Sequence, residues 1–388
     1  MKIAIVHDYL YQFGGAEKVV EKWLEMYPEA DIYTSLYTPD KFDVSKLYQK
    51  ANQEKRIQTT WLNKFFNIKT SSFSLIVFFK HFFWLYPIVM SFVVVKDYDV
   101  VIISSTFCAK NVRYKNCKKI IHYCHSPVRF LHGLTTETDH KTLNKFYRTS
   151  IPIFTFWLKW MDLKAVKYLN SRGCIWIANS TFIQKTIKKV YKTKSIVIYP
   201  PIELEKFLQV QLSPEDYYLS HGRISFHKRI DLAIKACLEL GKKLKISGSA
   251  GFQKEMDDLQ KIVDDFESRN PDKKGLIEFL GRTTDEQYIE LISNAKAFLF
   301  PGKEDAGIAP IEMLAAGLPV VAFEAGGALE YIQDGINGIF FNEQTVEDLK
   351  EAMLKFEQKT DWNTKQIKDS SLKFGQEQFV ESFNKLVS

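Results

Sequence analysis

The 388-residue sequence has few of the residues that define non-globular chains. It contains 18 Gly and 12 Pro, and 46% of its residues are hydrophobic, which excludes disordered and collagen-like classes. Its five cysteines form no C-x-x-C pair, so we interpret them as reduced thiols of a cytoplasmic protein and not as a disulfide scaffold. The first residues lack the basic segment and long apolar run of a signal peptide. A prior of about 150 residues per domain predicts two or three domains, and we take two.

Acidic residues are scarce in the first half of the chain. Residues 1–200 carry 30 Lys and Arg against 14 Asp and Glu, whereas the remainder carries 23 against 32. The basic half suggests an anionic partner such as phospholipid headgroups, nucleic acid or a phosphorylated substrate, and a solvated lysine-rich surface is the alternative. No nucleic-acid-binding motif accompanies the charge, so we predict no nucleic-acid partner.

Short apolar runs separated by helix-length intervals recur along the whole chain, which predicts an α/β protein with parallel, doubly wound sheets. A Pro pair at residues 200–201 opens a polar stretch to Glu215, where we place the boundary between domains 1–200 and 201–369. Helical periodicity marks the tail, residues 370–388. Thr283, followed three residues later by Glu286, predicts a capping box at a helix start. The predicted strands are residues 3–6, 32–36, 100–103, 120–123, 174–178, 196–198, 217–220, 244–247, 277–280, 297–300, 319–322 and 338–341.

The apolar stretch of residues 73–95 is long enough to cross a bilayer, but Lys80 lies near its centre. Since strands on both sides of the stretch should share one sheet, its two ends lie on the same side, and we exclude a single span. Either a buried helix pair or an element lying on a membrane surface fits. Aromatic residues interleaved with lysines suit the headgroup region. The candidate membrane or acceptor residues are Lys64, Lys69, Lys80, Phe82, Phe83 and Trp84.

The most informative segment, residues 297–321, reads as a strand, a polar loop with Gly307, and a helix beginning near Ile308. In an open parallel sheet such a helix N-terminus attracts an anion. Glu304 on the loop and Glu312 in the helix would repel a phosphate, so we expect them to accept hydrogen bonds from sugar or ribose hydroxyls.

Basic residues that could balance the charge of these glutamates follow the predicted first strand of the second domain. Gly222 permits close backbone approach, and Arg223 and Lys228 project from the next loop. A guanidinium fork and an ammonium group together suit a pyrophosphate. Arg229 reads equally well as a solvated charge.

Six motifs in order resemble a family 4 retaining glycosyltransferase of the GT-B fold, and the mannosyltransferase-like subgroup of bacterial polysaccharide biosynthesis is the most similar. The resemblance implies two Rossmann-like domains facing a cleft, with a C-terminal helix that crosses back to the first domain. The motifs are the glutamate pair at 304 and 312, Gly222-Arg223 with Lys228, Gly14-Gly15-Ala16-Glu17, residues 122–129 with His125, Ala178-Asn179-Ser180, and Tyr199-Pro200-Pro201.

Carried over by position, the resemblance implies a role for each motif. Arg223 and Lys228 would hold the diphosphate of a nucleotide-sugar donor, and Glu312 would bind its ribose. Glu304, with N–H groups near Gly307 and Ile308, would contact the transferred sugar. The remaining assignments are Gly14 and Gly15 at the phosphate and sugar, His125 near the reacting carbon, and Arg282 near the base.

The same resemblance favours transfer of mannose from GDP-mannose to a polyprenyl-diphosphate-linked or other membrane-associated saccharide, at the inner face of the cell membrane. Ala306 stands where the family usually has an aromatic residue, which puts the donor in doubt, and a UDP-hexose is the close alternative. No Asp-x-Asp pair stands in a metal-ligand context, and Arg223 and Lys228 can neutralise the leaving group, so we predict neither metal nor cofactor.

Three other functions fit parts of the pattern. A nucleotide-sugar 2-epimerase shares the two-domain architecture, but the spacing of the two glutamates argues against it. A nicotinamide dehydrogenase is disfavoured because Gly14-Gly15 is not a G-x-G-x-x-G motif. A non-catalytic membrane or RNA-binding protein would bind no nucleotide sugar, so donor hydrolysis distinguishes it from an enzyme.

Overall fold

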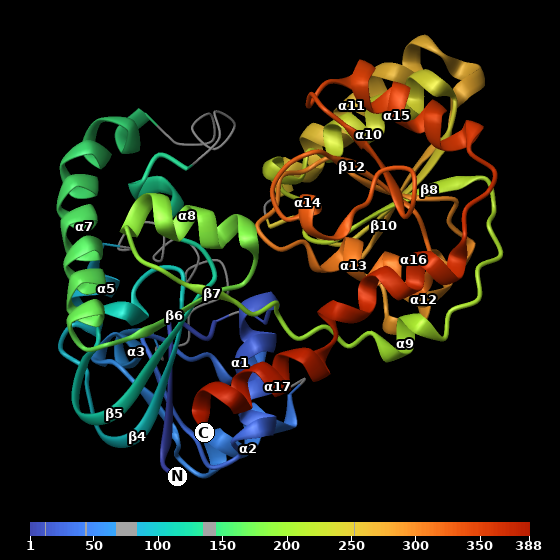
Figure 1. The fold of residues 1–388 in the computed structure, drawn as a ribbon. Coiled ribbons are helices and arrows are strands. Elements are labelled where there is room, and N and C mark those ends of the chain that lie inside the picture. Colours follow the sequence, from blue (N-terminus) through green and yellow to red (C-terminus); the bar gives the residue numbers. More distant parts are fainter. Residues whose placement is uncertain (12, 43–44, 67–83, 135–144, 252) are drawn as a thin grey trace. The chain divides into compact units, whose positions relative to one another are not determined.

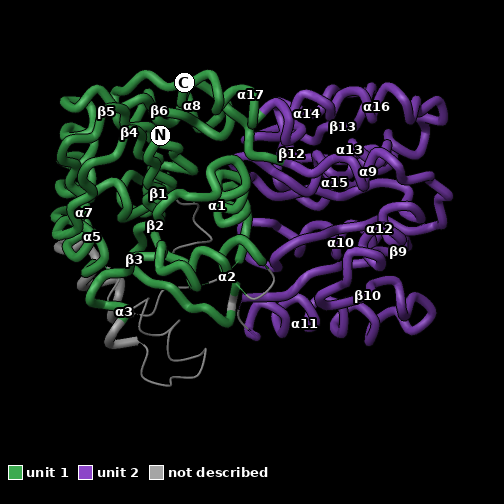
Figure 2. The backbone as a smooth tube through the Cα atoms, turned by 90° about the horizontal axis from the view of Figure 1, so that it is seen from below, with its two compact units in different colours: residues 1–135, 140–201, 379–388 green, residues 136–139, 202–378 purple. Residues whose placement is uncertain are grey.

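The computed structural model describes residues 1–388 except 12, 43–44, 67–83, 135–144 and 252. The chain forms two compact units (Figure 2). One holds residues 1–135, 140–201 and 379–388, and the other holds residues 136–139 and 202–378.

The first unit is built on a parallel sheet of seven strands in the order β3-β2-β1-β4-β5-β6-β7 (Figure 1). A parallel sheet was predicted, but the three-residue edge strand β3 was not. The strands β4 and β5 begin earlier in the sequence than predicted. The apolar runs did not reveal these N-terminal parts, because exposed polar residues occupy them. The strands are β1 (Ile3–His7), β2 (Asp31–Thr34), β3 (Ile57–Thr59), β4 (Val94–Ser105), β5 (Arg113–Cys124), β6 (Ile175–Ala178) and β7 (Ile196–Val197). The helices are α1 (Gly15–Met26), α2 (Lys46–Gln53), α3 (Trp61–Phe66), α5 (Leu85–Met90), α7 (Lys145–Ser171) and α8 (Thr181–Tyr191).

Two apolar cores cover the two faces of this sheet, because successive strand residues point to opposite sides. Ile3 and Ile5 of β1 contribute to one core, which also holds Trp23 of α1. Ala4 and Val6 contribute to the other, which holds side chains of α5, α7 and α8. Both faces are therefore buried, as in other doubly wound sheets.

The second unit contains a parallel sheet of six strands in the order β10-β9-β8-β11-β12-β13. The strands are β8 (Tyr217–His221), β9 (Lys243–Ser247), β10 (Ile277–Gly281), β11 (Phe298–Phe300), β12 (Val320–Phe323) and β13 (Gly338–Phe341). The helices are α9 (Glu205–Leu208), α10 (Ile230–Leu240), α11 (Gln253–Arg269), α12 (Asp285–Asn294), α13 (Ile308–Ala316), α14 (Ala328–Tyr331), α15 (Val346–Gln358) and α16 (Thr364–Ser371). The last helix, α17 (Gln376–Val387), belongs to the first unit from residue 379 onward.

One predicted helix start needs correction. The capping box opens α12 one residue later than predicted, with Thr284 as N-cap and Gln287 as its reciprocal partner. The polar stretch that ends at Glu215 contains the short helix α9. Of the apolar stretch 73–95, residues 73–83 lie outside the described residues; in the remainder α5 ends at Met90 and β4 begins at Val94. The described part of the chain contains no helix with the length and apolar character that a bilayer crossing requires.

The C-terminal helix α17 completes the first unit, as predicted. Its residues Phe379 and Phe383 are buried and pack on Trp23 of α1, with ring centroids 6.1 and 5.1 Å from that indole (Figure 1). Helix α17 thus packs on Trp23, which lies more than 350 positions earlier in the chain.

Candidate functional site

Each sheet reverses its strand order once, between β1 and β4 in the first unit and between β8 and β11 in the second. Helices leave opposite faces of a sheet at such a reversal, so a crevice opens outside the carboxyl ends of the two strands. Several of the predicted site residues lie at these two places, and we describe each cluster separately.

In the first unit, four side chains form a polar row across the carboxyl ends of β1, β4 and β5. The backbone N–H of Gly14 donates to Glu17 Oε2 at 3.0 Å, and Glu17 Oε1 lies 3.5 Å from His7 Nε2. His7 Nδ1 lies 3.0 Å from Ser104 Oγ, which lies 2.8 Å from His125 Nε2. His7 and Glu17 are almost fully buried. The row therefore connects the predicted residues Gly14 and His125, which the sequence did not link.

The chemistry of this polar row determines the state of His125. Burial, reinforced by the neighbouring His7, lowers the pKa of His125 to about 4, so its imidazole is neutral at neutral pH. Ser104 Oγ lies between His7 Nδ1 and His125 Nε2 and can donate to one of them while accepting from the other. His125 Nδ1 is the ring nitrogen that Ser104 does not engage.

Asp8, the residue after β1, is a structural anchor that the sequence analysis missed. Its carboxylate accepts hydrogen bonds from the backbone N–H groups of residues 106–109 at 2.7–2.8 Å and from Ser105 Oγ at 2.9 Å. Burial opposes ionisation, but the charge of His7 and these N–H groups hold the pKa of Asp8 below its usual value. Asp8 thus ties the end of β1 to the loop after β4. An aspartate directly after the first buried strand was the available signal.

In the second unit, Lys228 and Glu304 form an ion pair, with Lys228 Nζ 2.7 Å from Glu304 Oε1. Both side chains are mostly buried, and two glycines make room for the lysine. A Cβ at Gly222 would lie 2.9 Å from Lys228 Nζ, and one at Gly302 would lie 2.7 Å from Lys228 Cα. The sequence assigned the lysine to a diphosphate and the glutamate to a sugar, whereas the structure brings the two together.

The helix α13 begins directly after Gly307, as predicted, and Gly307 adopts a left-handed conformation with φ of +70°. The hydroxyl of Tyr331 from α14 packs against Gly307 and has no hydrogen-bond partner among the residues placed in the structure. Burial, together with the negative charge of Glu304, raises the pKa of Tyr331 well above its usual value, so the hydroxyl keeps its proton. No sequence signal pointed to Tyr331.

Glu312 lies in the second turn of α13 and is held by a second tyrosine. The hydroxyl of Tyr288 donates to Glu312 Oε2 at 2.8 Å, and the ring of His221 stacks on that of Tyr288 with centroids 3.9 Å apart. Because this arrangement engages one carboxylate oxygen, it orients Glu312 as an acceptor of further hydrogen bonds. Tyr288 and His221 were not predicted.

The remaining predicted residues are less closely tied to these clusters. Arg223 follows β8 and Arg282 follows β10, and both side chains are exposed. Trp84 is half-buried and packs against the core of the first unit. Lys69, Lys80, Phe82 and Phe83 lie outside the described residues, as does the side chain of Lys64 in α3. Within the described ranges no three His, Cys, Asp or Glu side chains are grouped as metal ligands.

Known proteins resemble this chain in sequence and in fold. Residues 202–371 match the family model described as glycosyl transferases group 1. The human alpha-1,3/1,6-mannosyltransferase ALG2 is 26% identical over 292 residues, which is 67% of this chain and 65% of the human protein. The mouse protein is 25% identical over 62% of this chain and 59% of its own length. The chain thus matches less than two thirds of the length of these curated relatives.

Two solved structures share the fold over nearly the whole chain. HepE of Anabaena, crystallised with UDP and glucose, is 18% identical with a TM-score of 0.65, covering 99% of this chain and 98% of its own. The sucrose-phosphate synthase of Thermosynechococcus elongatus is 14% identical with a TM-score of 0.67, covering 100% and 98%. At these identities the likeness concerns the fold, two Rossmann-like units of the GT-B type.

Proposed function

We propose that the chain is a retaining hexosyltransferase that uses a nucleotide-sugar donor, in keeping with the match of residues 202–371 to the group 1 glycosyltransferases. The observation that carries the proposal is the Lys228–Glu304 pair beside the N-terminus of α13, inside the matched segment. Mannose from GDP-mannose is the favoured donor, supported by the mannosyltransferases among the relatives. A UDP-hexose is the second candidate, supported by the UDP and glucose bound to HepE.

The Lys228–Glu304 ion pair explains how a carboxylate can lie beside a diphosphate without repelling it. Lys228 offsets the charge of Glu304, so the exposed Arg223 and the N–H groups at the start of α13 supply the net positive charge for a diphosphate. Glu304 accepts hydrogen bonds from hydroxyls of the transferred sugar. Glu312, oriented by Tyr288, accepts them from the ribose hydroxyls.

In the proposed reaction the bond between the anomeric carbon and the diphosphate breaks, and the acceptor hydroxyl attacks the same face of the sugar. The hydroxyl proton passes to the leaving phosphate oxygen, so the products are a glycoside of retained configuration and a nucleoside diphosphate. Negative charge grows on the leaving oxygen, and Lys228, Arg223 and the helix N-terminus stabilise it more in the transition state than in the ground state. No step of this reaction requires a metal ion or cofactor.

His125 has a defined part in this proposal. Because Ser104 engages its Nε2, the neutral imidazole offers Nδ1 for a hydrogen bond with a hydroxyl of the transferred sugar. Gly14 and Gly15 at the start of α1 allow close approach of a phosphate or sugar to the backbone. We further propose that the acceptor is a lipid-linked saccharide reached at the inner face of the cell membrane.

Donor binding and transfer are tested separately. A thermal-shift screen against GDP-, UDP- and dTDP-sugars should show stabilisation by GDP-mannose, and stabilisation by UDP compounds alone would overturn that choice. Hydrolysis of the bound donor without acceptor should release free sugar, whereas a 2-epimerase would return a changed nucleotide sugar. Lys228→Ala and Glu304→Ala should lose turnover, while Lys254→Ala on the exposed side of α11 should not. Full activity of Glu304→Ala would refute the assignment of that residue.

A further inference from the structure

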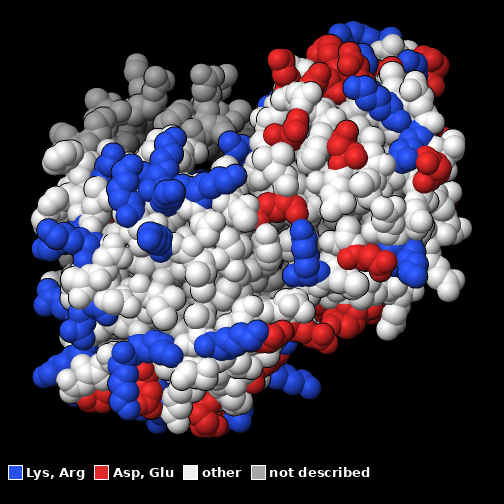
Figure 3. Space-filling model, in the orientation of Figure 1, with Lys and Arg blue, Asp and Glu red and all other residues white. Residues whose placement is uncertain are grey.

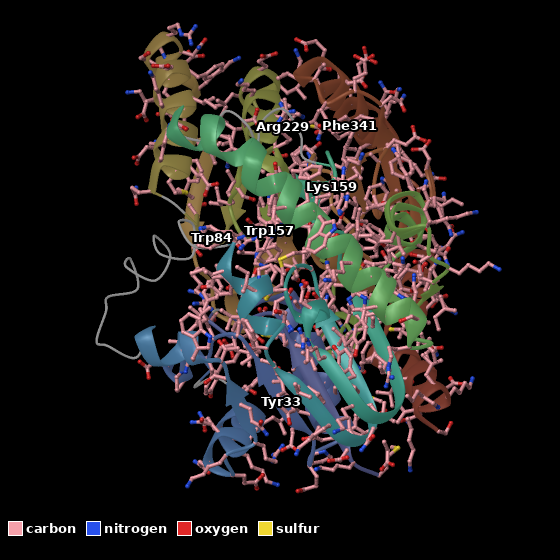
Figure 4. All side chains as sticks on the ribbon, turned by 90° about the vertical axis from the view of Figure 1, so that its left-hand side faces the viewer. Tyr33, Trp84, Trp157, Lys159, Arg229 and Phe341 are labelled. Atoms are coloured by element: carbon pink, nitrogen blue, oxygen red, sulfur yellow. The ribbon has the colours of Figure 1, made fainter. Side chains whose placement is uncertain are left out.

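The outer face of α7 carries large apolar side chains that the structure leaves exposed. Phe156, Trp160 and Leu163 are 78%, 52% and 40% exposed, and their spacing of four and three residues places them in one stripe along the helix. Trp157 and Lys159 flank the stripe; Figure 4 views the helix from this side and labels both residues. We call these five residues together with Lys164 the α7 outer face.

The opposite side of α7 explains why this face points outward. Asp162 is buried there, with Oδ1 2.6 Å from Lys110 Nζ and Oδ2 2.8 Å from His132 Nε2. Leu158 and Val166 pack beside it in the core. Because rotating the helix would break a buried ion pair, the apolar stripe cannot turn inward at low cost.

The charge of this region selects one class of partner. Residues 140–202 contain twelve Lys and Arg, and their one acidic residue is the buried Asp162. On α7, Lys164 Nζ lies 4.7 Å above the ring of Trp160. On α8, Lys185, Lys188 and Lys189 are exposed, and Figure 3 shows Lys and Arg side chains gathered over this helix.

We infer that the α7 outer face is a docking surface for an anionic lipid bilayer. Tryptophan and phenylalanine side chains insert at the headgroup boundary, and neighbouring lysines are attracted by anionic headgroups. The charge complementarity decides against a second copy of this chain as occupant, since that copy would bring the same cations to the interface. The inference deepens the proposed function by naming a surface through which a lipid-linked acceptor would be approached.

Vesicle cosedimentation tests the inference without any sugar donor. The protein should pellet with vesicles of equal parts phosphatidylcholine and phosphatidylglycerol, and much less with phosphatidylcholine alone. The double variant Phe156→Ala/Trp160→Ala should bind about tenfold or more weakly, because it removes two aromatic anchors. Lys159→Gln/Lys164→Gln should weaken binding to the anionic vesicles and reduce its salt dependence.

Matched controls lie in the second unit. Leu354→Ala and Leu372→Ala remove side chains that are 43% and 48% exposed, and Lys254→Gln/Lys261→Gln removes two exposed lysines of α11. None of these should change vesicle binding. The circular dichroism melting curve of every variant should match the parent, because the side chains replaced are exposed.

Three outcomes would overturn the inference: no binding of the parent to anionic vesicles at low salt, binding unchanged in Phe156→Ala/Trp160→Ala, or a parent dimer in solution that this variant dissociates. Transfer to a water-soluble acceptor is measured in parallel. Loss of vesicle binding with transfer intact would support the surface and leave the enzyme assignment standing. Absence of transfer in the parent would refute the enzyme assignment alone.

Discussion

Replacement of Gly307 by alanine tests whether the start of α13 is as tightly enclosed as the structure indicates. Gly307 has a φ of +70°, where a side chain costs about 1 kcal/mol. Its added Cβ would also lie 2.1 Å from the Tyr331 hydroxyl oxygen, far inside contact distance, and overpacking of this kind costs about 1–3 kcal/mol. We expect Gly307→Ala to lower the free energy of unfolding of the second unit by about 2–4 kcal/mol.

Two further variants separate these contributions. Gly335 has nearly the same φ, +71°, but a Cβ there meets no atom within 4 Å, so Gly335→Ala should lose about 1 kcal/mol. Tyr331→Phe removes the clashing oxygen and leaves ring carbon Cζ 3.1 Å from the new Cβ, so it should restore part of the loss in Gly307→Ala. Alone, Tyr331→Phe should be neutral or slightly stabilising, because its buried hydroxyl has no partner within the described structure.

The measurement is the free energy of unfolding from urea denaturation. Unfolding at each urea concentration is monitored by pulsed hydrogen exchange of peptides from residues 298–323, which report on β11, α13 and β12. A loss in Gly307→Ala no larger than that in Gly335→Ala would show that Tyr331 does not press on Gly307. Failure of Tyr331→Phe to restore stability in the double variant would show the same. Either result would refute the described enclosure of the α13 N-terminus.

Three further predictions follow from buried charges. Lys228→Ala should lower kcat by about a hundredfold or more, with a smaller change in KM, because the ammonium stabilises charge that develops on the leaving phosphate. Asp162→Ala should cost about 3–5 kcal/mol in urea denaturation because Lys110 stays buried without its partner, and Asp162→Asn should cost less. Burial lowers the pKa of His122 to about 3 and of His125 to about 4 from 6.5, so between those values and 6.5 the unfolded chain binds more protons than the native chain. The contribution of these histidines to the free energy of unfolding should be complete above pH 6.5 and decrease as the pH is lowered toward 4. The decrease should be less steep in His122→Leu. An unchanged slope in that variant would contradict the burial of the imidazole.

Local patterns in the sequence predicted the two parallel sheets and placed the candidate donor-binding residues in loops after their strands. Apolar runs mark strands that are buried on both faces, and helix-length intervals between them require parallel connections. Since ligand-binding loops follow the carboxyl ends of such strands, Gly307, Glu304 and Lys228 could be placed before the structure was known. The error at Thr283 arose because two adjacent threonines offer the same capping signal, and the backbone selects Thr284.

The sequence by itself thus determined the two-sheet architecture, because strands and helices follow from short-range periodicity. It also determined which residue types stand at the second unit's site, because the loops of that site directly follow the strands. Tertiary structure decided which of these groups meet: Lys228 with Glu304, and His125 with His7 through Ser104. It also decided the orientation of α7, whose apolar residues occur on both sides. The buried Asp162 turns Trp160 outward, and that choice depends on contacts with Lys110, more than fifty residues away in the chain.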